Sequence, residues 1–258
     1  MKSFYRLFNY EFAAMGRVLL ILCAVMFIAT WKLVGDEIAD YSEHKVNERY
    51  EDIYAASGGM TLALFVFAAF SAYFVIRLYS NYWGSKSIYT LLALPMKREA
   101  LYAARLAAFA VGLTGLVAMQ WLCIRFGFDL VSDKTASYGD GRFVMHNGLF
   151  LAVIRSAELR LFMPVSAGGI VAAIGMLAAW TTGLMYVVTC ERARRYWLIG
   201  IAAVAVYMMF RAYRRMTDWA WAYDLTEASL YRNGIILLAF AAFFVWHSIR
   251  MYRRGAIA

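Results

Sequence analysis

Long apolar stretches separated by shorter polar ones dominate the chain. A helix needs roughly 20 mostly apolar residues to cross the hydrocarbon core of a bilayer. Six stretches approach or exceed that length, namely residues 17–34, 59–79, 101–125, 164–189, 196–210 and 233–249. Apolar residues do not alternate at every second position, and the chain has only two prolines, which favours helices over a membrane barrel. The pattern predicts an all-α integral membrane protein with about six transmembrane helices in a single domain, residues 1–258.

Residues 2–16 precede the first stretch and have a helical pattern of their own. One face carries four apolar side chains, Phe4, Phe8, Phe12 and Met15. This pattern predicts an amphipathic N-terminal helix that lies along the bilayer interface. Glu11 falls at the edge of the apolar face. It either reaches lipid headgroups, or pairs with a basic residue of the bundle, or contacts a partner subunit.

Two connections are long and polar. Residues 35–57 are strongly acidic and indicate a solvated extension; a cation site there lacks EF-hand spacing. Residues 126–163 begin with a turn-rich part at 129–142 and continue with helical spacing of apolar residues over 147–161. The second part predicts an external amphipathic helix on the outer leaflet. The following stretch starts at Pro164 and is rich in glycine and alanine, which lets a neighbouring helix approach closely.

Composition agrees with a membrane protein. Apolar residues make up 63% of the chain and the mean hydropathy is +0.58, against roughly 45–50% apolar residues in soluble domains. The net charge of +9 does not indicate nucleic acid, because the basic residues stand at the ends of apolar stretches, where a membrane surface explains them. Arg105, one turn inside its stretch, is expected to extend back to the surface that carries Lys97 and Arg98.

Six spans place both termini on one side of the membrane. Basic residues in 86–98, 191–195 and the C-terminal tail favour the cytoplasm for that side, while Arg211, Arg214 and Arg215 count against it. We therefore expect a multi-pass protein with both termini in the cytoplasm.

Motifs for catalysis, nucleotide binding and metal binding are absent from the sequence. It contains no G-x-x-x-x-G-K-[ST], no H-E-x-x-H and no CxxC, and its three histidines belong to different elements. No carboxylate falls in the middle of an expected span, so an ion-coupled relay has no evident carrier. These observations predict no catalytic residue, no metal site, and no cofactor in this chain.

Residues 85–100, S-K-S-I-Y-T-L-L-A-L-P-M-K-R-E-A, connect the second and third spans. Ile88, Leu91, Leu92 and Pro95 have the spacing of a short amphipathic helix, and basic residues flank it. Such a polar-flanked loop either just connects two spans or contacts a partner. The order of span, short helix, T-L-L-x-L-P turn, basic pair and span resembles the cytoplasmic coupling loop of ABC-2-type transporter permeases. The N-terminal segment F-Y-R-L-F-N-Y-E-F and the six spans extend the resemblance over the chain.

The resemblance implies the membrane subunit of an ATP-driven exporter in a bacterial plasma membrane, itself not an enzyme. ATP and magnesium would be bound by a separate ATPase subunit, in two copies, and a second permease subunit, identical or related, would complete the assembly. The substrate would be a peptide, an antibiotic or a lipid-type molecule. The expected ATPase-coupling residues are Ile88, Tyr89, Leu91, Leu92, Leu94, Pro95, Lys97 and Arg98. The expected interfacial-helix residues are Phe4, Phe8, Glu11 and Phe12.

Two other functions remain open at the level of sequence. One is a self-sufficient channel, secondary carrier or polytopic membrane enzyme, which would need an ionisable or catalytic cluster in the bilayer plane. The other is an immunity protein that sequesters an amphiphilic peptide with its acidic outer segment.

Overall fold

The computed structural model describes residues 2–39, 48–83, 98–138, 148–217 and 226–253. Six helices in these ranges are long and apolar enough to cross a membrane. They are α1 (Lys2–Glu37), α4 (Gly59–Trp83), α6 (Arg98–Ser137), α9 (Ala167–Arg192), α10 (Ile199–Thr217) and α11 (Thr226–Arg253). The prediction of an all-α protein with six spans is confirmed.

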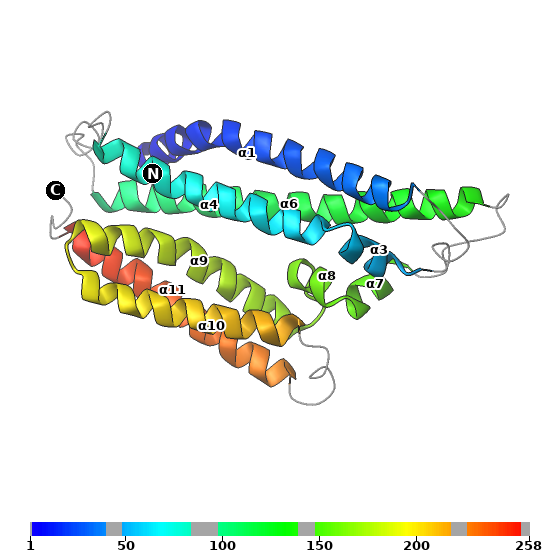
Figure 1. Cartoon of the computed structure of the whole chain (residues 1–258). Coiled ribbons are helices and arrows are strands. Elements are labelled where there is room, and N and C mark those ends of the chain that lie inside the picture. The colour runs from blue at the N-terminus through cyan, green and yellow to red at the C-terminus, as the bar shows by residue number, and fades with distance from the viewer. Residues whose placement is uncertain (1, 40–47, 84–97, 139–147, 218–225, 254–258) are drawn as a thin grey trace.

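The long helices form two layers of three (Figure 1). The first half consists of α1, α4 and α6, with α1 packed mainly against α6. The second half consists of α9, α10 and α11, with α9 packed mainly against α11. Three short helices, α3 (Tyr50–Ala56), α7 (Leu149–Arg155) and α8 (Ala157–Phe162), lie at one end, called here the cap end. The first residues of α1 and the last of α11 lie at the opposite, terminal end.

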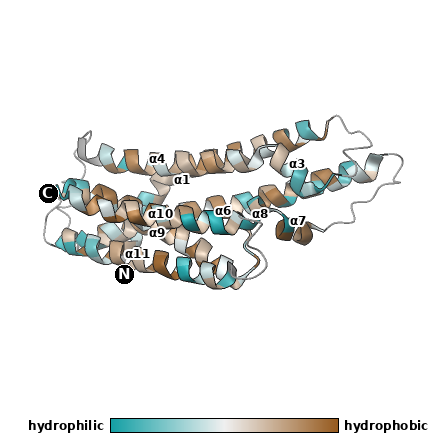
Figure 2. Cartoon of the chain, turned by 60° about the horizontal axis from the view of Figure 1, so that its bottom comes forward, coloured by the Kyte–Doolittle hydropathy of each residue, from teal (hydrophilic) through white to brown (hydrophobic). Residues whose placement is uncertain are grey.

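Hydrophobic residues run along α4 and cover α7, and hydrophilic residues gather toward the ends of the long helices (Figure 2). Many large apolar side chains on the helices are exposed, among them Leu20, Phe65 and Trp246. Because hydrocarbon rather than water is the expected surrounding, these exposed side chains fit a membrane-spanning bundle. By helix length and hydropathy the chain is a multi-pass membrane protein.

Stacked aromatic rings hold α4 against α6 in the first half. The rings of Phe74 and Phe109 are parallel, with centroids 3.9 Å apart, and Phe70 lies beside them. A Cβ at Gly112 would stand only 2.5 Å from the Phe70 ring. Glycine at this position is therefore what lets the Phe70 ring lie against α6.

A close crossing of α9 and α11 holds the second half together. A Cβ added to Gly175 would lie 2.8 Å from the carbonyl oxygen of Gly234, and one added to Gly234 would lie 2.8 Å from the backbone of Val171. The two backbones meet because neither position carries a side chain. This confirms the expectation that small residues of this stretch serve internal helix packing.

The cap end has its own hydrophobic core. Tyr50 and Tyr54 of α3 are buried against α6, where the Tyr50 hydroxyl donates to the Ile124 carbonyl at 2.7 Å and Gln120 donates to the Tyr54 hydroxyl at 2.7 Å. Burial raises the pKa of both phenols well above the ordinary value. Both tyrosines therefore join α3 to α6 in their neutral form.

Several helices extend beyond their predicted ends, among them α11, which begins at Thr226 and ends at Arg253. Residues 2–16 and 17–34 form one continuous helix, α1, because the apolar face of the N-terminal segment packs into the bundle core. α6 continues to Ser137 through residues expected to be turn-rich, since Gly127, Val131 and Thr135 are buried at helical spacing. α10 likewise continues to Thr217 on buried Ala212 and Met216.

The external amphipathic helix expected over residues 147–161 is divided into α7 and α8. Ser156 separates them, and its hydroxyl accepts a hydrogen bond from the Leu159 backbone N–H at 3.2 Å. This is an N-cap, which starts a new helix at Ala157. The fourth span starts at Ala167 rather than at Pro164, because Ser166 caps it in the same way through the Gly169 N–H.

Candidate functional site

Three charged side chains from three helices meet inside the first half. Arg105 of α6 donates from Nε to Glu11 Oε1 of α1 at 2.9 Å. Arg77 of α4 donates from Nη2 to Glu11 Oε2 at 3.1 Å. Glu11 is 2% exposed and Arg105 only 1% exposed. Because each carboxylate oxygen accepts from a different arginine, Glu11 connects α1, α4 and α6 through charge-assisted hydrogen bonds.

This charged cluster lies within the helices and not at their tips. Arg77 lies about two turns before the last residue of α4, and Arg105 lies about two turns after the first residue of α6. The expectation that Arg105 extends to the surface is wrong, since Glu11 provides a buried partner for it. Of the alternatives left open for Glu11, the ion pair within the bundle is the one the structure shows. A carboxylate therefore does lie within a candidate span, Phe4–Glu37.

The aromatic residues predicted for the interfacial helix form a stack along α1. Ring centroids of Phe4 and Phe8 are 6.4 Å apart and those of Phe8 and Phe12 are 5.7 Å apart. Phe8 and Phe12 are half-buried against the core of the first half, while Phe4 is more exposed. Glu11 directly precedes Phe12 in the sequence, and its side chain is buried inside the bundle.

Most of the predicted coupling residues lie outside the described residues. They are Ile88, Tyr89, Leu91, Leu92, Leu94, Pro95 and Lys97. Arg98 is described; it is exposed and is the first residue of α6.

The helices on either side of residues 84–97 are tied to both halves of the molecule. At the start of α6, Glu99 accepts two hydrogen bonds from Arg253 at the end of α11, at 2.6 and 3.1 Å. Near the end of α4, the Arg192 guanidinium of α9 stands 5.1 Å from the centre of the Tyr79 ring. These two contacts join the halves at the terminal end, where α4 ends and α6 begins.

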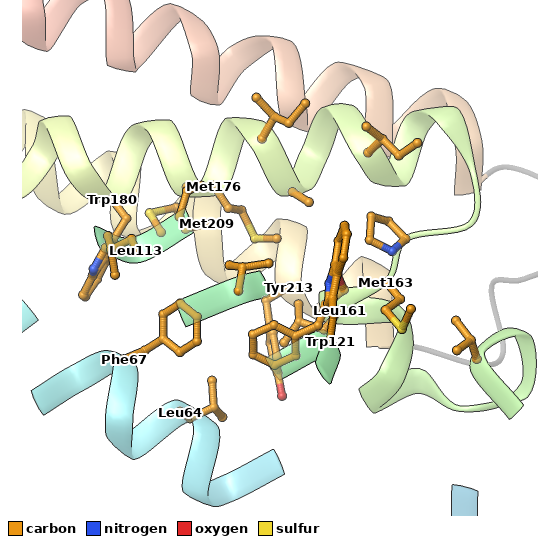
Figure 3. Close-up of a pocket in the computed structure, with 18 of the residues that line it drawn as sticks. Leu64, Phe67, Leu113, Trp121, Leu161, Met163, Met176, Trp180, Met209 and Tyr213 are labelled. Atoms are coloured by element: carbon orange, nitrogen blue, oxygen red, sulfur yellow. The ribbon is translucent and has the colours of Figure 1, made fainter. Parts of the chain in front are cut away.

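A large apolar groove of about 1060 Å³ separates the two halves toward the cap end. It is lined from the first half by Leu64, Phe67 and Leu113, and from the second by Met176, Met209 and Tyr213, with α7 and α8 contributing at the cap end (Figure 3). Leu64 and Phe210 are among the lining side chains that remain exposed. The groove thus opens to the outer surface of the bundle, and its volume is near the upper end for ligand pockets.

The polar groups that border the groove are largely satisfied by the protein itself. The Trp180 indole N–H of α9 donates to the Ser71 hydroxyl of α4 at 3.0 Å, which is a polar link between the halves. The Trp121 indole N–H of α6 donates to the Phe162 carbonyl at 2.6 Å. With both indole donors occupied, the groove presents methyl groups, thioethers and aromatic rings to any occupant.

A smaller apolar space of about 420 Å³ continues along α6 and α9 toward the terminal end. It shares Ile174 and Leu177 with the large groove, and small residues such as Ala107 and Ala178 form its walls. Apolar space therefore remains between the halves beside α6 and α9, whereas Met185, Val188 and Tyr252 of the second half are buried in one core with side chains of the first half.

Sequence reasoning missed the groove and two members of the charged cluster. Arg77 and Arg105 did have a signal, because each is a charge inside an apolar stretch and such residues face a bundle interior. The groove had no such signal in the sequence, because side chains that face lipid, the protein core or the groove are all apolar and cannot be told apart by pattern.

Among the described residues, no three His, Cys, Asp or Glu side chains are close enough to hold a metal ion. No family model, curated protein or solved structure matches the chain. The described residues form a helical, multi-pass membrane protein with six candidate spans, a charged cluster inside one half and an apolar groove between the halves.

Proposed function

We propose that the chain is the membrane subunit of an ATP-driven exporter and works with a separate ATPase. The proposal starts from the resemblance of residues 85–100 to the coupling loop of ABC-2-type permeases. It places both termini and residues 85–100 in the cytoplasm of a bacterial cell, with the ATPase bound at the terminal end of the bundle.

The observation that carries the proposal is how the helices beside this segment are connected. α4 leads into it and α6 leads out of it, and both are bound to α1 through Glu11. A displacement of the segment by an ATPase would move α1, α4 and α6 together, because bending any one of them away would break a buried ion pair. The first half would thus respond as a unit.

The apolar spaces between the halves support such a movement. A half that responds as a unit needs a partner surface against which it can shift, and the apolar space between α6 and α9 offers one. Among the described residues, Trp180 donates to Ser71 beside this space, and Arg253 donates to Glu99 at the terminal end. Rocking of one half against the other would then open a path beside or between membrane subunits.

A second candidate function gains support from the charged cluster. A self-sufficient carrier needs an ionisable group in the membrane, and Glu11 supplies one within a candidate span. Its carboxylate, however, is already held by Arg77 and Arg105, so a transported cation would have to replace both ion pairs. This favours a connecting role for Glu11 over ion binding.

The test is co-purification of the tagged full-length protein from its native host in mild detergent, followed by mass spectrometry. We expect a Walker-motif ATPase to be recovered with the wild type and lost with Leu91→Asp/Leu92→Asp. The matched control is Leu151→Asp/Ile154→Asp, which places the same charge on two exposed residues at the cap end and should retain the ATPase.

Membrane insertion should be equal for all three proteins. Unchanged recovery of the ATPase with the double variant would exclude residues 85–100 as its binding site. A wild-type preparation without any ATPase would favour the carrier, and ion flux into vesicles would then be measured.

A further inference from the structure

Basic residues lie on the helices at the cap end of the apolar groove, next to its lining residues but not among them. The helices that border this end, α7, α8 and α10, carry five arginines and one acidic residue, Glu158. The arginines are Arg155, Arg160, Arg211, Arg214 and Arg215. An apolar groove with arginines on the helices at one end is complementary to a molecule with apolar chains and an anionic head.

Two of these arginines are placed beside lining residues. On α10, Phe210 lines the groove and Arg214 lies one turn further along the same face, exposed. On α8, Arg160 directly precedes Leu161 and Phe162, which both line the groove. The Arg160 Nε donates to the Ser156 carbonyl at 3.2 Å, which fixes the guanidinium beside these lining residues, and burial lowers its pKa.

We propose that the groove between the two halves binds an anionic phospholipid, with its acyl chains along the apolar wall and its phosphate at Arg160 and Arg214. Basic pockets between transmembrane helices bind anionic lipid headgroups on the cytoplasmic side of membranes, and the proposal applies the same charge pairing to the leaflet at the cap end. The groove opens sideways to the surface that faces hydrocarbon, so a membrane lipid can enter without crossing water. The inference concerns this chain alone and does not depend on an ATPase partner.

The apolar wall explains why a lipid fits better than a polar occupant. The indole N–H groups of Trp121 and Trp180 are taken by Phe162 and Ser71, so the deep part of the groove offers few hydrogen bonds. A peptide would bring backbone N–H and C=O groups that find few partners there, at a cost of several kcal/mol per group. Acyl chains bring no such groups.

The experiment is native mass spectrometry of the detergent-solubilised full-length protein with equimolar palmitoyl-oleoyl phosphatidylglycerol and phosphatidylcholine. We expect one phosphatidylglycerol bound in preference to phosphatidylcholine. Arg214→Gln should keep the lipid but reduce the preference about fivefold, since one arginine near a lipid surface contributes about 1 kcal/mol. Arg6→Gln, an exposed arginine at the terminal end, serves as the charge control and should leave the preference unchanged.

A pair of adjacent alanines on α4 tests the apolar wall. Ala68 lines the groove, while Ala69 is exposed and does not line it. Ala68→Trp should fill the space and lose the bound lipid, and Ala69→Trp should keep it. If Ala68→Trp does not fold, Ala173→Phe on the opposite wall replaces it in the comparison.

Equal binding of the two lipids by the wild type, or equal lipid loss by Ala68→Trp and Ala69→Trp, would overturn the proposal. A lipid-free dimer would overturn it as well, because a second copy of the chain would then cover the groove. Retained lipid preference together with a missing ATPase would leave the lipid site in place and refute only the exporter.

Discussion

Glu11 forms ion pairs with Arg77 and Arg105 inside the first half. Glu11 and Arg105 are almost completely removed from solvent, and their charges are tolerable there only because they are paired. At the terminal end, Glu99 and Arg253 form a second pair, but with side chains 33% and 65% exposed. The same chemical pair thus occurs once buried and once exposed to solvent.

We predict that Glu11→Gln destabilises the protein by about 3–5 kcal/mol, the usual cost of removing one partner of a buried ion pair. The amide cannot neutralise Arg105 or Arg77, and the two guanidinium groups would then repel each other. The measurement is the thermal unfolding midpoint in detergent, determined by fluorescence-detected size exclusion after heating.

The matched variant is Glu99→Gln, which should leave that midpoint almost unchanged because an exposed pair contributes little. Equal shifts for the two variants would show that burial does not distinguish the two pairs.

At the scale of helices, the decisive contact is the crossing of α9 and α11. Several small residues of residues 164–189 were expected to permit close packing, and Gly175 against Gly234 is where the backbones actually meet. A Cβ added to Gly183, two turns further along α9, would lie 3.6 Å from the Phe244 ring, which is an ordinary van der Waals distance. Two glycines of one helix therefore differ in how much space they have.

We predict that Gly175→Ala lowers the stability of the protein by about 1–3 kcal/mol, the typical cost of overpacking. The new methyl group would stand 2.8 Å from the Gly234 carbonyl oxygen and force the helices apart. Gly183→Ala should instead be neutral or stabilising by up to about 1 kcal/mol, since alanine favours a helix and its methyl group has room. The measurement is the thermal unfolding midpoint of each variant. A midpoint for Gly175→Ala at or above that of Gly183→Ala would contradict a close backbone contact of α9 and α11 at Gly175.

For the whole molecule, the arrangement in two halves defines both the groove and the two ends. The cap end and the terminal end would lie on opposite sides of a membrane, because α4, α6 and the other long helices run between them. Together with the distribution of basic residues, this leads us to expect the terminal end in the cytoplasm.

We predict that a membrane-impermeant maleimide labels Asp133→Cys in intact cells and labels Arg6→Cys only after the membrane is opened. Asp133 is exposed on the cap-end extension of α6 and Arg6 is exposed on α1 at the terminal end. The three native cysteines are buried or half-buried, which keeps the background low. The reverse labelling pattern would invert the orientation and move residues 85–100 to the outside.

Sequence by itself determined the number of spans and their approximate positions, because the length of an apolar stretch is a local property and a bilayer of fixed thickness selects for it. It did not determine helix ends at α1, α6 and α10, where buried positions such as Val131 and Met216 extend the helix through polar residues. Helix ends depend on packing partners that the local pattern does not contain.

Only the tertiary structure decided what Glu11 pairs with and where the groove lies. Glu11 reaches Arg77 across 66 positions of sequence and Arg105 across 94, so these ion pairs exist only once α1 packs against both α4 and α6. The groove likewise depends on how the two halves pack, because it is the space that their side chains leave between them. Its lining is apolar, as are many of the exposed side chains on the long helices. A one-dimensional pattern specifies which residues avoid water, but the shape of the packed helices specifies which of them face each other.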